Sequence, residues 1–75
     1  MTNRLPALKA REIIRVLKQL GFYEVRQKGA HLCFRNTIGK FTIVPVHTGE
    51  DIGRGLLRKI LNDIGISEKD LLKLL

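Results

Sequence analysis

Two histidines, His31 and His47, are the side chains of this 75-residue chain best suited to moving protons at neutral pH. Imidazole gains and loses its proton between about pH 5 and 8, so it can act as a general base or acid. His31 follows Lys28-Gly29-Ala30, which is typical of a tight turn. RNA carries its own nucleophile, the 2′-hydroxyl group, so a minimal ribonuclease needs only a base, an acid and cations that stabilise the phosphorane. His31 could therefore cleave RNA without a cofactor, helped by the basic residues Arg26, Lys28 and Arg35.

The same residues have simpler interpretations. A single histidine on a strand is more often a half-exposed polar residue, and His47, which follows Pro45-Val46, fits a loop residue that caps local backbone. His31, Cys33 and His47 could together ligate zinc, but a His-x-Cys pair with one distant histidine is a weak metal-binding pattern. Cys33 is better interpreted as a small apolar residue.

The sequence lacks the motifs of larger enzyme classes. It contains no glycine-rich phosphate loop, no Cys-x-x-Cys pair and no Ser-His-Asp signature. A length of 75 residues predicts a single domain over residues 1–75 and excludes a two-lobed enzyme or a dinucleotide-binding fold. We expect any active site to be shallow and to lie on one face of the molecule.

Three features of the sequence predict a cytoplasmic protein. The single cysteine, Cys33, cannot form an internal disulfide. No apolar run approaches the ~20 residues that a membrane helix needs. The first residues contain no continuous apolar segment of the kind found in signal peptides.

The charge is concentrated in the first half of the chain. Lys and Arg number 14 against 7 Asp and Glu, which gives a net charge of +7. Residues 1–40 hold nine of the basic and two of the acidic side chains, whereas residues 41–75 hold five of each. A strongly basic domain with clustered Lys and Arg is typical of a nucleic-acid-binding protein. The basic charge has two alternative interpretations. It could make the surface soluble, or it could form a basic face that binds an acidic protein partner.

Periodic apolar residues predict one helix at the start of the chain and two at its end. The first spans residues 7–20, with Pro6 suited to its start and Gly21 to the left-handed residue after its end. The second spans residues 54–64 and is closed by Gly65. Ser67, with Asp70 three residues later, predicts the N-cap of a short last helix.

Between these helices the sequence predicts three strands, over residues 23–28, 31–35 and 40–46. In the second strand Leu32 and Phe34 alternate with polar or small residues, so one face is expected to be buried and the face with His31, Cys33 and Arg35 to be open. The order α-β-β-β-α-α predicts an α+β two-layer sandwich, with a three-stranded antiparallel sheet and helices on one face. Double-stranded-RNA-binding domains share this layout.

Several short motifs occur in an order that covers roughly residues 10 to 72. They are Glu12-Ile13-Ile14-Arg15-Val16-Leu17, Leu20-Gly21-Phe22, Arg26-Gln27-Lys28-Gly29-Ala30-His31, Val44-Pro45-Val46-His47, Gly55-Leu56-Leu57-Arg58-Lys59-Ile60-Leu61 and Ile64-Gly65-Ile66-Ser67. In this combination the chain resembles the HicA family of bacterial toxins, the small mRNA interferases of HicA–HicB toxin–antitoxin pairs.

The resemblance implies a fold, an activity and a partner. The fold would be like that of a double-stranded-RNA-binding domain, and the activity that of a metal-independent endoribonuclease that cleaves mRNA and needs no cofactor. The family's catalytic histidine corresponds to His31, and Ala30 stands where relatives usually have a small polar residue. A second departure, Gly53-Arg54-Gly55-Leu56, is expected to affect helix capping. The expected partner is a HicB-type antitoxin that covers the active face.

The leading hypothesis is therefore the toxin of a type II toxin–antitoxin system. His31 would be its general base or acid, with His47 as a possible second proton carrier, and the phosphate-binding cations would be Lys28, Arg26, Arg35 and Lys40. The second hypothesis is a non-catalytic RNA-binding module that reads the shape of a duplex. The third is a protein-interaction domain whose basic face meets an acidic partner.

Overall fold

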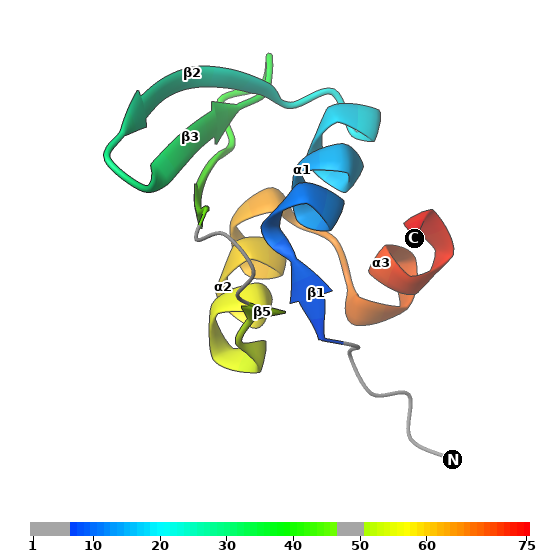
Figure 1. Cartoon of the computed structure of the whole chain (residues 1–75). Helices are drawn as coiled ribbons and strands as arrows, with labels where there is room; N and C mark the ends of the chain where they lie inside the picture. The colour runs from blue at the N-terminus through cyan, green and yellow to red at the C-terminus, as the bar shows by residue number, and fades with distance from the viewer. Residues whose placement is uncertain (1–6, 47–50) are drawn as a thin grey trace.

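The computed structural model describes residues 7–46 and 51–75 (Figure 1). Its three longer strands form an antiparallel sheet in the order β2-β3-β4, and helices pack against one face of this sheet. The expected α+β class is confirmed. The elements in chain order are β1 (Leu8–Lys9), α1 (Ala10–Gln19), β2 (Tyr23–Lys28), β3 (His31–Arg35), β4 (Phe41–Pro45), β5 (Asp51–Ile52), α2 (Arg54–Ile64) and α3 (Glu68–Leu74).

The first helix begins three residues later than the sequence predicts. Leu8 and Lys9 pair with Ile52 and Asp51 in a two-stranded sheet that the sequence analysis missed, because a strand of two residues has no periodicity. The Lys9 ammonium group also pairs with the Asp51 carboxylate at 2.8 Å. Helix α1 then starts at Ala10, where the Lys9 backbone N–H donates to the Glu12 carboxylate at 3.1 Å. The predicted start at Pro6 lies outside the described residues.

The two predicted glycine stops are confirmed. Gly21 adopts φ 89° and Gly65 adopts φ 79°, in the left-handed region that costs glycine little. After Gly21, the backbone N–H of Phe22 donates to the Leu17 carbonyl at 2.9 Å, and the Phe22 side chain is buried. Each glycine therefore ends its helix and lets the chain turn toward the next element.

Helices α2 and α3 follow the prediction closely. Helix α2 spans the predicted 54–64. Helix α3 is capped by Ser67, whose hydroxyl accepts from the Asp70 backbone N–H at 3.0 Å, while the Asp70 carboxylate accepts from the Ser67 N–H at 3.4 Å. In the described residues, no helix has the length and apolar character needed to cross a bilayer.

The hydrophobic core lies between the helices and the strands β3 and β4. Phe34 of β3 and Val44 of β4 are fully buried and belong to one core cluster with side chains from all three helices. Strand β2 is exposed along its whole length, and in Figure 1 the β2–β3 hairpin projects away from the helices. The helices therefore cover β3 and β4 and leave β2 as an open edge strand. The helical residues of the core are Ile13, Val16, Leu17, Leu57, Ile60, Leu61, Ile64 and Leu71.

One polar contact links the buried face of the sheet to α2. The hydroxyl of Thr42, which is 1% exposed, donates to the Asp63 carboxylate at 3.0 Å. The Lys59 ammonium group donates to the same carboxylate oxygen at 3.0 Å from the exposed side. Asp63 thus satisfies a hydroxyl that the packing of β4 on α2 removes from water.

We expect the Asp63→Ala substitution to lower the free energy of unfolding by about 1–3 kcal/mol, because it leaves the buried Thr42 hydroxyl without its acceptor. Lys59→Ala is the matched control, since it removes the other partner of the same carboxylate. Its side chain is 66% exposed, so its loss is expected to cost less than about 1 kcal/mol. Urea unfolding of both variants measures the difference. Equal losses would show that the buried hydrogen bond contributes no more than the surface ion pair.

Candidate functional site

A hollow of about 530 Å³ lies on the sheet face that the helices leave open. We call this face the outer face. Its volume falls within the range of about 300–1,000 Å³ that is usual for ligand pockets. The residues that line the hollow come from the β2–β3 hairpin and from β4, and they are Arg26, Lys28, Gly29, Ala30, His31, Cys33 and Ile43.

The strand register arranges the outer face in three rows, because residues paired across antiparallel strands point to the same side. The turn row, next to the β2–β3 turn, is Lys28, His31 and Pro45. The middle row is Arg26, Cys33 and Ile43. The aromatic row, at the other end of the strands, is Tyr23, Arg35 and Phe41.

A β-bulge in β2 makes these rows possible. Tyr23 and Arg26 are three residues apart, so in a regular strand they would point to opposite faces. The register shifts between Glu24 and Arg26, which leaves Val25 as an extra residue. Tyr23 therefore shares the outer face with Arg26 and Lys28. This bulge was not predicted from the sequence.

The β2–β3 turn holds His31 in place at the edge of the hollow. Lys28 and His31 pair directly across the two-residue turn, in which Gly29 adopts φ 58°. The Val46 backbone N–H donates to the Ala30 carbonyl at 2.6 Å and ties the turn to the end of β4. The His31 side chain is exposed, and among the described residues no hydrogen bond or ion pair engages its ring. An incoming ligand can therefore reach it.

Cys33 corrects one expectation about the open face. It points to the outer face but is only 4% exposed, so it is not open as the sequence analysis expected. The reason is that β3 is the central strand, and Arg26 and Ile43 flank Cys33 from both sides. Its interpretation as a small apolar residue agrees with this burial. In the part of the chain that the structure describes, no three His, Cys, Asp or Glu side chains form a metal-binding group, and His47 lies outside that part.

The structure brings Arg26, Lys28 and His31 together and places the other two predicted cations elsewhere. Arg35 shares the outer face but lies four residues along β3 from His31, a distance of about 13 Å. Lys40 is turned toward the end of α2, where its Nζ atom lies 3.1 Å from the position that a Cβ on Gly65 would take. There its charge faces the negative end of the helix dipole.

The cations around the hollow have no acidic partners in the described ranges 7–46 and 51–75. The carboxylates of Asp51, Asp63 and Glu68 pair with Lys9, Lys59 and Arg58, and those of Glu12 and Asp70 cap helices. Glu24 is the one acidic residue in the three-stranded sheet, and its pairing with Phe34 puts it on the opposite face. The positive charge of Arg26 and Lys28 is therefore available to an anionic ligand.

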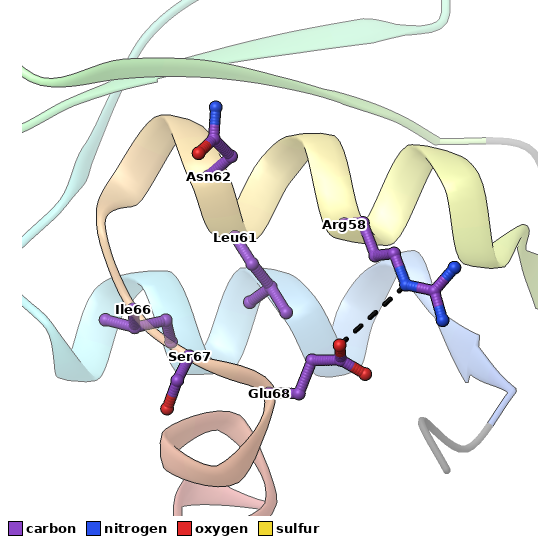
Figure 2. A pocket seen from close by; sticks show the side chains of 6 residues that line it. All are labelled: Arg58, Leu61, Asn62, Ile66, Ser67 and Glu68. Atoms are coloured by element: carbon purple, nitrogen blue, oxygen red, sulfur yellow. Dashed lines mark ion pairs between the residues drawn. The ribbon is translucent and has the colours of Figure 1, made fainter.

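A second hollow, of about 330 Å³, lies where α2 turns into α3 (Figure 2). Figure 2 shows the Arg58 guanidinium group facing the Glu68 carboxylate, and these charges are 3.8 Å apart. None of the residues expected to do chemistry lines it. It is formed by Arg58, Leu61, Asn62, Ile66, Ser67 and Glu68.

Sequence reasoning missed three outer-face residues, Tyr23, Phe41 and Ile43. The alternation of residues 41–45 would have been enough to place Phe41 and Ile43 on one face, since Thr42 and Val44 between them are buried. No comparable signal was available for Tyr23, because the bulge at Val25 breaks the alternation of β2.

The chain matches the model of a known protein family. The model of the family described as the HicA toxin of bacterial toxin–antitoxin systems matches residues 10–66 of the chain. The matched range contains every residue that lines the outer-face hollow. No curated protein matches the chain.

Proposed function

Because the chain belongs to the HicA family of toxins from bacterial toxin–antitoxin systems, and so has a cognate antitoxin, we propose that it is an endoribonuclease that cleaves messenger RNA. The observation that carries the proposal is the outer-face hollow, which combines one exposed histidine with two cations that have no acidic partner among the residues that the structure describes. Such a site meets the needs of RNA cleavage with a small number of side chains.

The proposed reaction is an attack of the RNA on its own backbone. His31 acts as general base or acid: as base it removes the proton of a 2′-hydroxyl group, and the 2′-oxygen then forms a bond to the adjacent phosphorus. The bond from phosphorus to the 5′-oxygen breaks, and this oxygen takes up a proton from a second carrier, either another side chain or a water molecule. The products are a 2′,3′-cyclic phosphate and a free 5′-hydroxyl end. Arg26 and Lys28 stabilise the charge that builds up on the phosphorane oxygens.

The antitoxin is proposed to be a HicB-type protein that covers the outer face. This position would place it over His31 and exclude RNA from the hollow. The free chain is therefore the form to test for activity.

We expect the purified chain, free of antitoxin, to cleave a labelled single-stranded RNA in excess EDTA. The 3′ ends of the products should carry 2′,3′-cyclic phosphate, because the 2′-oxygen is the nucleophile and no metal ion is required. Analysis of the product ends by mass spectrometry identifies the reaction. Binding without cleavage would instead favour a non-catalytic RNA-binding module, and cleavage that disappears with EDTA would contradict a metal-independent mechanism.

A further inference from the structure

We propose that the aromatic row, Tyr23, Arg35 and Phe41, is a subsite that stacks an unpaired base of the RNA strand. This inference rests on the proposed function, since it takes RNA to be the ligand of the outer face. It adds a binding site about 13 Å from His31, at the opposite end of β3. It also identifies the substrate as single-stranded at this position.

The distribution of aromatic residues supports the subsite. The chain has three Phe, one Tyr and no Trp. Phe22 and Phe34 are buried in the core, whereas Tyr23 and Phe41 are 48% and 40% exposed. Both exposed rings lie in the same row of the outer face, on either side of Arg35. Each ring leaves part of its apolar surface in water, so a ligand that covers it gains free energy.

Arg35 completes a surface suited to nucleobases. Its guanidinium carbon lies 5.7 Å from the centre of the Phe41 ring, in cation–π contact. A guanidinium plane and an aromatic ring both offer flat faces on which a base can stack. The Arg35 charge also attracts the phosphate next to such a base. Arg35 thus has a role in the aromatic row and not at the reacting phosphate.

The charges favour RNA over a protein as the ligand of this row. Moving along the outer face from the aromatic row to the turn row, the cations are Arg35, Arg26 and Lys28, and Glu24 points away. Aromatic side chains that follow a positively charged track are the usual arrangement for single-stranded nucleic acids. A strand lying across the three rows would place its backbone on the cations and one base on the aromatic row.

Stacking on the aromatic row requires the base to be unpaired. In a duplex each base is hydrogen-bonded to its partner and covered by its neighbours, so its flat face is not available to a side chain. A distance of about 13 Å corresponds to about four nucleotides of a stacked strand, at ~3.4 Å per nucleotide. The stacked base therefore lies a few nucleotides from the phosphate that reaches His31.

The chain itself supplies a probe for this contact, because Tyr23 is the only tyrosine and there is no tryptophan. The ligand is a 12-nucleotide RNA without internal pairing and with 2′-O-methyl groups, which block the nucleophile and keep the strand intact. We expect this oligonucleotide to quench the fluorescence of Tyr23. The same sequence annealed to its complement should produce much less quenching.

Substitutions at Phe41 test stacking directly. Phe41→Ala should weaken binding of the single strand about 5- to 150-fold, the effect of losing one stacked base. Phe41→Leu should lose nearly as much, since it keeps apolar bulk without a ring, and Phe41→Trp should restore affinity. Ile38→Ala is the matched control, because Ile38 is 76% exposed in the turn after β3 and lies outside the three rows. It should bind like the unaltered chain.

Salt dependence separates stacking from charge. The quantity to measure is the slope of the logarithm of the RNA association constant against the logarithm of the salt concentration. Phe41→Ala should leave this slope unchanged. Lys28→Gln should reduce its magnitude by about one, as expected for one lost phosphate contact. Thermal unfolding of each variant confirms that it is folded.

Four results would overturn the subsite. Unchanged affinity in Phe41→Ala would remove stacking and leave the proposed cleavage intact. Equal quenching by single strand and duplex would remove the requirement for an unpaired base. If Phe41→Ala weakens only the complex with the antitoxin, the aromatic row is a protein interface. Failure of the unaltered chain to bind the oligonucleotide would reject RNA as the ligand of the outer face, and with it the proposed function.

Discussion

The His31→Ala variant is expected to cleave RNA about 10²- to 10⁴-fold more slowly than the unaltered chain, the usual effect of losing a general acid or base. Its affinity for RNA should change little, because Arg26 and Lys28 remain in the hollow. The fold should also persist, since the His31 side chain is exposed and makes no hydrogen bond or ion pair within the described residues. Single-turnover cleavage at saturating protein measures this loss separately from binding.

The chain offers a matched control in its other histidine. His47→Ala removes the same type of side chain, and its single-turnover rate should fall less than that of His31→Ala. If His47→Ala loses activity and His31→Ala does not, then His47 is the main proton carrier and the assignment of His31 is wrong. Loss in both variants would identify a pair of histidines that share the two proton transfers.

The Phe34→Ala variant is expected to lose about 3–5 kcal/mol of its free energy of unfolding, the usual cost of truncating a buried phenylalanine. Phe34 is fully buried in the central strand of the sheet. At about 0.05–0.15 kcal/mol per residue, a domain of this length has about 4–11 kcal/mol in total. The substitution therefore leaves a marginally stable or unfolded chain.

Phe41→Ala is the control for this second effect. It makes the same truncation on the neighbouring strand, but Phe41 is 40% exposed on the outer face. Urea unfolding should place its midpoint close to that of the unaltered chain, while the midpoint of Phe34→Ala falls or vanishes. Similar losses in the two variants would contradict the assignment of the inner face as the core.

The helices and their ends could be predicted from the sequence because their signals are local. The apolar stripe Leu57, Ile60, Leu61 and Ile64 predicted the buried face of α2, and all four side chains are buried. Gly65 and the pair Ser67 and Asp70 marked the boundaries that follow. Each of these signals operates within one or two turns of a helix, so no knowledge of the tertiary structure was needed.

The parts that the sequence did not predict depend on contacts between distant residues. Leu8 and Lys9 form a strand only because Asp51 and Ile52 lie beside them. Cys33 is buried by its neighbours on β2 and β4, and Lys40 lies against the end of α2. At the candidate site, the spacing of Lys28, Gly29 and His31 around a turn was enough to predict that cation and histidine meet. Their roles in catalysis stay a prediction.

The extra residue in β2 has a consequence for comparisons between relatives. Glu24 pairs with Phe34 and Arg26 pairs with Cys33, and these two partners are consecutive residues of β3. Val25 is therefore the extra residue, and the inward and outward alternation of β2 matches that of β3 on both sides of it. A relative with this strand shortened by one residue at the bulge keeps Tyr23, Arg26 and Lys28 on the same side of the sheet. An alignment can instead place the gap at another position in β2. Between that position and the bulge, inward-facing residues of one chain are then aligned with outward-facing residues of the other. It would then match outer-face residues of one toxin with inward-facing residues of another.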